Sequence, residues 1–106
     1  NVQAEVIDLR VVNPLKFNSV IESVKKTGQL FVIDCGWKNC GLAGEVIASV
    51  TESLSPSFFK SSPKRFTLTD TPAPTSKPLE KLYYHDVNNL YNLIRSHVGK
   101  KIEKSV

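Results

Sequence analysis

Three glycines between an expected strand and an expected helix form the pattern in this chain that is most suggestive of a ligand site. Gly36, Gly41 and Gly44 are positioned so that unpaired N–H groups and a helix dipole could hold an anion. Their spacing is not the dinucleotide-binding pattern, and no Gly-Lys-Ser/Thr follows for a nucleoside triphosphate. Glu45 would repel a phosphate but suits the first turn of a helix. We therefore expect mainly a tight turn here, and keep the three glycines as a candidate anion loop.

The cysteines and histidines could supply a metal site or a reactive thiol. Cys35 and Cys40 are the only cysteines, and His85 and His97 the only histidines. The histidines lie far from the cysteines along the chain and in unrelated contexts, so a four-ligand zinc site is not indicated. A catalytic thiol at Cys35 would need one of the histidines as its base. We expect instead that Cys35 is a small buried hydrophobic residue and that both thiols are free.

Two aspartates, Asp34 and Asp70, each end an expected strand. Carboxylates at neighbouring strand ends could share a proton and perform acid–base chemistry. Aspartates at strand ends also form turns by accepting hydrogen bonds from nearby backbone N–H groups, and we favour that role.

Trp37 lies in a polar loop and has two interpretations, either packing onto its own domain or anchoring a protein interface. The loop around it and the proline-rich segment 70–76 both follow strands expected to be parallel, so both should emerge at the same edge of the sheet. An apolar contact patch would then form there. The candidate interface or docking residues are Trp37, Lys38, Asp70, Pro72 and Pro74.

Apolar periodicity alternates between strand and helix patterns along the chain. We expect strands at 4–9, 30–33 and 65–69, helices at 17–26 and 42–54, a short helical turn at 78–83, and a last helix from the N-cap Asp86 past Val98. Gly28 is expected to end the first helix in a left-handed conformation. This order predicts a single α/β domain over residues 1–106, with a mostly parallel sheet and helices on both faces.

Composition excludes several function classes. The 106 residues carry a net charge of +4, but the basic residues do not form a stripe with stacking aromatics, so nucleic-acid binding is not expected. No apolar run approaches the roughly 20 residues of a membrane span. We expect a cytoplasm-like reducing compartment and no complete catalytic site in this chain.

Four stretches of the sequence resemble the C-terminal domain of the transketolase-like, thiamine-diphosphate-dependent enzymes. The beta subunit of the decarboxylating component of pyruvate and branched-chain 2-oxo-acid dehydrogenases is the most similar in pattern. The stretches are Ala4–Arg10 followed by Asn13-Pro14-Leu15, Ser23–Gly28, Gly41–Ala48, and Asp70–Ser76 with Leu79-Glu80. The chain departs from the family at Lys16, Cys35 and Ala43-Gly44, which marks it as a divergent member.

The resemblance implies a three-layer fold in which the first strand and helix of the family domain are missing here. It also implies that thiamine diphosphate and magnesium are bound in the parent enzyme, an oxidoreductase or transferase, and not by this chain. No catalytic, cofactor-binding or metal-binding residue is carried over, because no such family motif is matched.

The role implied for this domain is assembly, meaning contact with other domains or subunits in a homo-oligomer or heterotetramer and docking of an acyltransferase core. The implied location is the cytoplasm, or the mitochondrial matrix in a eukaryote. The rival hypotheses are a free-standing module that binds a small anion and a small thiol enzyme.

Overall fold

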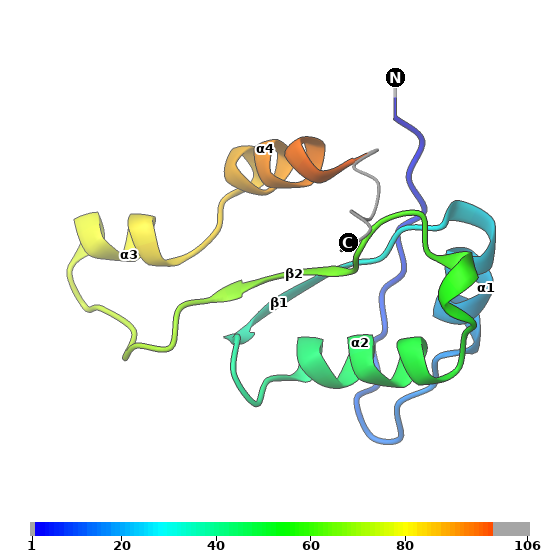
Figure 1. Ribbon diagram of the computed structural model, residues 1–106. Coiled ribbons are helices and arrows are strands. Elements are labelled where there is room, and N and C mark those ends of the chain that lie inside the picture. Colours follow the sequence, from blue (N-terminus) through cyan, green and yellow to red (C-terminus); the bar gives the residue numbers. More distant parts are fainter. Residues whose placement is uncertain (1, 99–106) are drawn as a thin grey trace, which may run out of the picture.

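The fold is a small three-layer α/β arrangement around two parallel strands. The computed structural model describes residues 2–98. Its elements are α1 (Asn18–Thr27), β1 (Phe31–Trp37), α2 (Leu42–Glu52), the 3-10 turn η1 (Pro56–Phe58), β2 (Lys64–Leu68), α3 (Lys77–Tyr83) and α4 (Val87–His97). In Figure 1, α2 lies below the strands and α4 above them, so that helices cover both faces. This confirms the expected α/β class with parallel strands.

Helix α1 begins and ends where the sequence predicts. Lys25 and Lys26 lie in its last turn, where positive charge favours the negative end of the helix dipole. Gly28 takes a left-handed conformation with φ of 75°, and its N–H donates to the carbonyl of Val24. Only glycine adopts this conformation without strain, so the expected helix stop is confirmed.

The core lies mainly between the two helices α1 and α2 and the chain that links them. Val24 and Val50 are almost completely buried, and each lies on the apolar face of its helix. The buried cluster consists of Val20, Val24, Leu30, Val46, Val50, Leu54 and Phe59. Burial of each large aliphatic side chain contributes about 1.5–3 kcal/mol, so this cluster supplies much of the stability of the fold.

Strand β1 is longer than the sequence predicts. The strand predicted from the apolar run 30–33 continues through Asp34 to Trp37. Its register with β2 shifts between Ile33 and Trp37. Such an irregularity places extra residues on one strand, and exposure of the side chains still alternates along β1. Gly36 and Trp37 therefore belong to β1, and their placement in a loop is wrong.

The expected strand at 4–9 is also wrong. Residues 4–9 are extended but pair with no strand in the described part of the chain. Val6 is 93% exposed, whereas Leu9 packs against the core. Glu5 forms an ion pair with Lys26 of α1, and hydrogen bonds from Lys26 and Ser23 lower the pKa of Glu5 from its usual value. The β-branched pattern is present, but strand formation also needs a neighbour.

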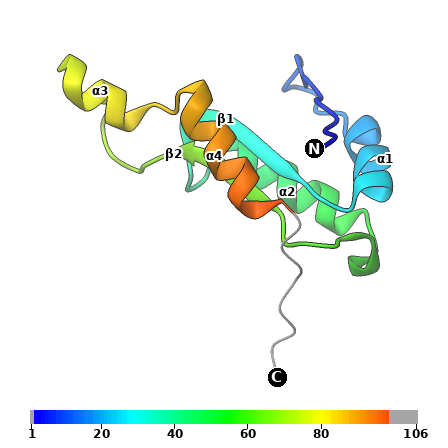
Figure 2. The same cartoon turned by 90° about the horizontal axis from the view of Figure 1, so that it is seen from above.

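The two C-terminal helices lie apart from the α1–α2 core. Figures 1 and 2 show α3 beyond the end of the sheet that is remote from α1, and α4 above the strands. Asp86 caps α4 by accepting a hydrogen bond from the Asn89 N–H at 2.7 Å, as expected. Helix α4 ends at His97, and Val98 is its C-cap in an extended conformation, so the expected continuation of the helix past Val98 is wrong. Within residues 2–98, no helix combines the length and apolar character needed to cross a membrane.

Candidate functional site

The loops that follow β1 and β2 lie at the same edge of the sheet, as predicted from parallel strands. The Asn39 N–H donates to Oδ1 of Asp70 at 3.3 Å, and the Lys38 N–H donates to the Leu68 carbonyl at 3.2 Å. Asp70 thus accepts from backbone, as favoured above, but it links two loops instead of closing its own turn. These bonds hold the candidate interface residues Lys38 and Asp70 next to each other.

Trp37 packs on its own domain through a hydrogen bond. Its indole Nε1–H donates to the Tyr83 hydroxyl at 3.1 Å, and that hydroxyl lies 2.9 Å from the Thr71 carbonyl and 3.3 Å from the Thr69 carbonyl. Tyr83 therefore joins β1, the proline-rich segment and α3. Trp37 nevertheless remains 52% exposed, so its ring is still available to a partner. Pro72 is exposed and Pro74 half-buried on the same segment.

The Asp34 carboxylate lies close to two of the three glycines of the candidate anion loop. A Cβ on Gly36 would lie 2.9 Å, and one on Gly41 3.9 Å, from Oδ2 of Asp34. Gly41 is the N-cap of α2, so Asp34 places its negative charge at the end of the helix that favours an anion. A diphosphate at this position would meet that carboxylate. That carboxylate disfavours a phosphate beside Gly36 and Gly41, whereas Gly44 lies near the Arg65 guanidinium.

The cysteines and histidines do not form a reactive pair within residues 2–98. Cys35 is exposed, as is Cys40, so the expectation that Cys35 is buried is wrong. Exposure alternates along this part of β1, and Cys35 lies on the same exposed face of the strand as Ile33 and Trp37. The two histidines, His85 and His97, bond elsewhere, the latter to the Leu93 carbonyl. No group of three metal-ligating side chains gathers in this part of the chain.

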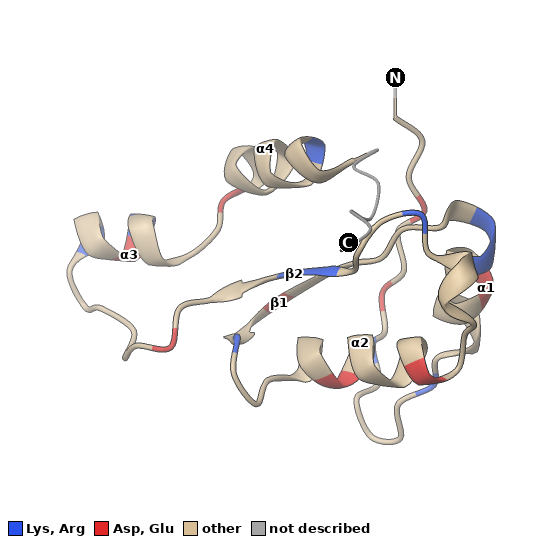
Figure 3. Ribbon diagram, viewed as in Figure 1, with Lys and Arg blue, Asp and Glu red and all other residues tan. Residues whose placement is uncertain are grey.

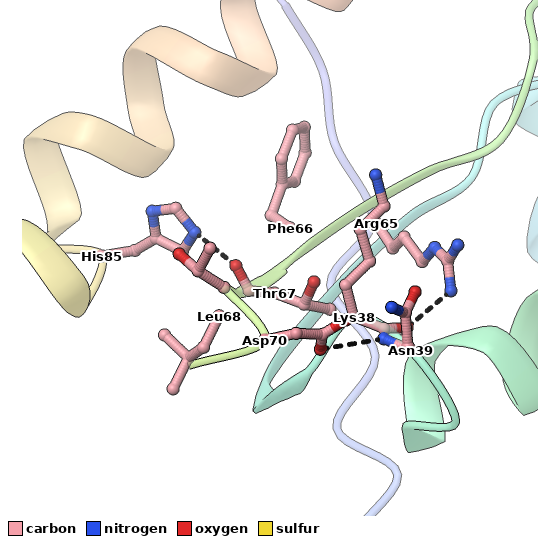
Figure 4. Close-up of a pocket in the computed structure, with 9 residues that line it drawn as sticks. Lys38, Asn39, Arg65, Phe66, Thr67, Leu68, Asp70 and His85 are labelled. Carbon is pink, nitrogen blue, oxygen red and sulfur yellow. Dashed lines mark hydrogen bonds between the residues drawn. The ribbon is translucent and has the colours of Figure 1, made fainter. Parts of the chain in front are cut away.

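His85 instead binds one carbonyl on the edge of β2 that faces away from β1. Its Nε2 lies 2.9 Å from the Thr67 carbonyl, and its Nδ1 lies 2.9 Å from Oδ1 of Asn89. Because a carbonyl only accepts, Nε2 carries the hydrogen. Figure 4 shows His85 on one side of β2, with Arg65, Lys38 and Asn39 on the other.

Three residues of this region were missed by sequence reasoning. Tyr83, Arg65 and His85 come from separate segments, and no spacing rule connects them to Trp37 or Lys38. Arg65 donates from its guanidinium to the Lys38 carbonyl at 2.8 Å and so holds the loop after β1 against β2. Only the alternation of side chains along β2 gave a partial indication of the position of Arg65, because it predicts on which face of the sheet each side chain lies. Asp34 and Asp70 have different neighbours, so the expected alternative of a shared proton between them is not supported.

Comparison with known protein families identifies the domain. The profile of the transketolase C-terminal domain matches residues 1–90, which is most of the chain. The chain belongs to the transketolase C-terminal domain family. This transketolase C-terminal domain has relatives among the beta subunits of dehydrogenases, which agrees with the resemblance seen in its sequence.

The relatives are subunits of larger enzymes. The chain is 43% identical over 79 residues to the mitochondrial pyruvate dehydrogenase E1 component subunit beta of Ascaris suum, covering 74% of this chain and 22% of that protein. It is 36% identical over 95 residues to the Rickettsia bellii pyruvate dehydrogenase E1 component subunit beta, covering 90% and 29% respectively. It is also 35% identical over 82 residues to an acetoin:2,6-dichlorophenolindophenol oxidoreductase subunit beta of Cupriavidus necator, covering 77% and 24%. This transketolase C-terminal domain thus spans about a quarter of the length of these relatives.

Proposed function

We propose that this chain is a non-catalytic assembly domain of a thiamine-diphosphate-dependent 2-oxo-acid dehydrogenase beta subunit, or of a related transketolase-like enzyme. In this role it supports subunit association and the docking of partner proteins, and the catalytic groups belong to other parts of the enzyme. The observation that carries the proposal is the family match together with relatives named as beta subunits of such dehydrogenases.

Exposed apolar side chains support an assembly role. They are concentrated in two parts of the chain, the extended N-terminal segment and the helices α3 and α4. The exposed large hydrophobic residues there are Val2, Val6, Ile7, Val11, Val12, Leu79, Leu82, Tyr84, Val87 and Tyr91. Extensive exposed apolar surface is typical of surfaces that are covered by another protein or domain. The interface residues proposed above, from Trp37 to Pro74, lie between these two parts in sequence.

A physical argument supports the proposal that this domain binds no cofactor. It concerns the glycine loop before α2, the stretch of the sequence that most resembles a phosphate-binding loop. Asp34 lies at the N-terminus of α2, and Glu45 follows in the first turn. Two carboxylates repel a diphosphate at close range. We propose that thiamine diphosphate and magnesium are held by other domains of the parent enzyme.

The partners proposed are the other domains and subunits of that enzyme, arranged as a homo-oligomer or heterotetramer, with an acyltransferase core as a further partner. The proposed location is the cytoplasm, or the mitochondrial matrix in a eukaryote. Relatives with the word mitochondrial in their names support the second location.

Two measurements test the proposal. Titration calorimetry of the chain with thiamine diphosphate and magnesium should give no heat of binding, and micromolar affinity would contradict a non-catalytic role. In the parent enzyme, the exposed Val6→Ser and Val12→Ser should weaken subunit association in analytical ultracentrifugation while cofactor affinity is unchanged. Ala48→Ser, an exposed change on α2, is the matched control. Unaltered association in the valine variants would show that the N-terminal segment is not an assembly surface.

A further inference from the structure

Strand β2 has one edge paired with β1 and one edge free of strands in the described part of the chain. The Lys64 N–H donates to the Leu30 carbonyl, and the Leu68 carbonyl accepts from the Lys38 N–H, so these residues direct their main-chain groups toward β1 and its flanks. Backbone groups alternate in direction along a strand. The N–H and C=O groups of Arg65 and Thr67 therefore face the free edge, and the bond from His85 Nε2 to the Thr67 carbonyl agrees with this direction.

Among residues 2–98, three backbone groups on this edge have no hydrogen-bond partner and could pair with another molecule. His85 takes the Thr67 carbonyl, which leaves the N–H and C=O of Arg65 and the N–H of Thr67. An extended segment lying against β2 would exchange bonds with Arg65, and one of its carbonyl groups would accept a hydrogen bond from the Thr67 N–H. Unpaired groups of this kind are a template for the addition of a strand.

Grooves run along both sides of the free edge. One of about 530 Å³ lies on the α4 side, and its walls include Lys38, Thr67 and His85. The other, also of about 530 Å³, lies on the α2 side, where its walls include Lys38, Arg65 and Lys64. Space for side chains is therefore available above and below a segment that pairs with β2, as alternating side chains require.

The charge along this edge is positive. Lys64 and Arg65 begin β2, and Lys38 directly follows β1. Figure 3 shows the ribbon in the colour of basic residues at both places. None of the three takes part in an ion pair within residues 2–98. Asp70 is the single acidic side chain among those that line either groove, and its Oδ1 already accepts from the Asn39 N–H.

We propose that the free edge of β2 binds an extended peptide segment that carries carboxylate side chains and adds to the sheet as a third strand. The backbone groups of Arg65 and Thr67 supply the pairing, and Lys38, Lys64 and Arg65 select an acidic sequence. Like charge disfavours a second copy of β2 at the same place. The contact is short, so we expect a dissociation constant on the order of 100 µM at low salt.

Nuclear magnetic resonance with the 15N-labelled chain tests this inference. The ligand is a blocked peptide of alternating Glu and Val, and the comparison peptide alternates Lys and Val. Addition of the acidic peptide should shift the amide signals of Arg65 and Thr67 in a saturable way, and an increase in salt from about 50 to 500 mM should weaken binding at least tenfold. The basic peptide should leave both signals unchanged.

Further arms separate a strand from a simple anion. The same Glu–Val peptide with every backbone amide nitrogen methylated keeps the charge but has no backbone N–H donors, so it should bind at least fivefold more weakly. Free glutamate and inorganic phosphate should produce no saturable shift at about 1–5 mM. These concentrations are on the order of ten times the expected dissociation constant of the acidic peptide, or more. If either matches the acidic peptide, the edge is an anion site and the inference is overturned.

Charge variants give an independent check. Lys64→Glu alters an exposed residue and should weaken binding of the acidic peptide at least fivefold. Lys81→Glu makes the same charge change on the exposed surface of α3 and is the matched control. Equal weakening by both variants, or no binding by the unchanged chain, would also overturn the inference.

Discussion

Replacement of Gly41 by alanine tests how closely the chain packs at the start of α2. A Cβ at this position would lie 2.1 Å from the Trp37 carbonyl oxygen, whereas carbon and carbonyl oxygen normally approach to roughly 3.3–3.6 Å. The obstacle is backbone and not a flexible side-chain end, so either β1 or the N-terminus of α2 must move. Forced overpacking typically costs about 1–3 kcal/mol, and occasionally more when backbone shifts. We expect Gly41→Ala to lower the free energy of unfolding by about 3 kcal/mol.

Urea denaturation followed by far-ultraviolet circular dichroism measures this loss. With a slope of about 1 kcal/mol per M for a chain of this size, the midpoint should fall by roughly 3 M. Against the ~5–15 kcal/mol of an ordinary domain, such a loss is a large fraction of total stability. The Trp37–Tyr83 hydrogen bond should also weaken, because displacement of the Trp37 carbonyl moves the residue that donates it.

Gly44→Ala is the matched control, three residues further into the same helix. A Cβ there would lie 3.2 Å from Nη1 of Arg65, a side-chain end that donates to the Lys38 carbonyl and needs to shift only slightly. Alanine is favoured over glycine in a helix interior by about 0.8–1 kcal/mol, so this variant should be slightly more stable. If Gly41→Ala unfolds at the same midpoint as the unchanged chain while Gly44→Ala shows its gain, the close approach to Trp37 is not real and the reasoning fails.

Three further predictions concern the core and the surface, each measured as free energy of unfolding. Val50→Ala should lower the free energy of unfolding by about 1.5–3 kcal/mol because Val50 is fully buried. Val6→Ala should change it by no more than about 0.5 kcal/mol, and a large effect there would contradict the 93% exposure of Val6. Ser61→Ala should raise stability by about 1 kcal/mol, because the buried Ser61 hydroxyl has no hydrogen-bond partner in the described structure; a loss would reveal a partner. The lowered pKa of Glu5 means that its stabilising contribution is present above the carboxyl's ordinary pKa and is lost as pH falls through the lowered value. Glu5→Gln should remove that part of the pH dependence, and an unchanged profile would show that the contact with Lys26 contributes nothing.

Local signals were sufficient for most of the helices. Gly28 and the lysines before it end α1, and Asp86 begins α4, because these effects act within one turn. The apolar run at 30–33 predicted a strand, but not its continuation to Trp37. That extension depends on pairing with β2, a contact between residues about thirty positions apart that no local pattern contains.

The N-terminal segment and the site show where sequence reasoning fails. Residues 4–9 have strand composition, yet a strand also needs an edge to pair with, and composition cannot supply one. Cys35 was placed in the core because cysteine is usually buried, whereas in the structure it lies on the exposed face of β1 with Ile33 and Trp37. The sequence correctly predicted that the loops carrying Asn39 and Asp70 lie at the same end of the sheet, because parallel strands alone require this. The roles of Tyr83 and His85 depend on how α3 and α4 pack, which the sequence pattern does not specify.

The position of Trp37 gives this chain a local optical reporter. It is the only tryptophan, and its indole is bonded to Tyr83 of α3 while remaining half in contact with solvent. Intrinsic fluorescence excited in the indole band therefore reports on whether α3 is docked against the end of β1, not on the state of the α1–α2 core. A heat or urea scan read by fluorescence would trace the release of α3, and circular dichroism would trace loss of the helices as a whole. If α3 leaves first, the two curves separate, and the interval between them measures how independently this helix is attached.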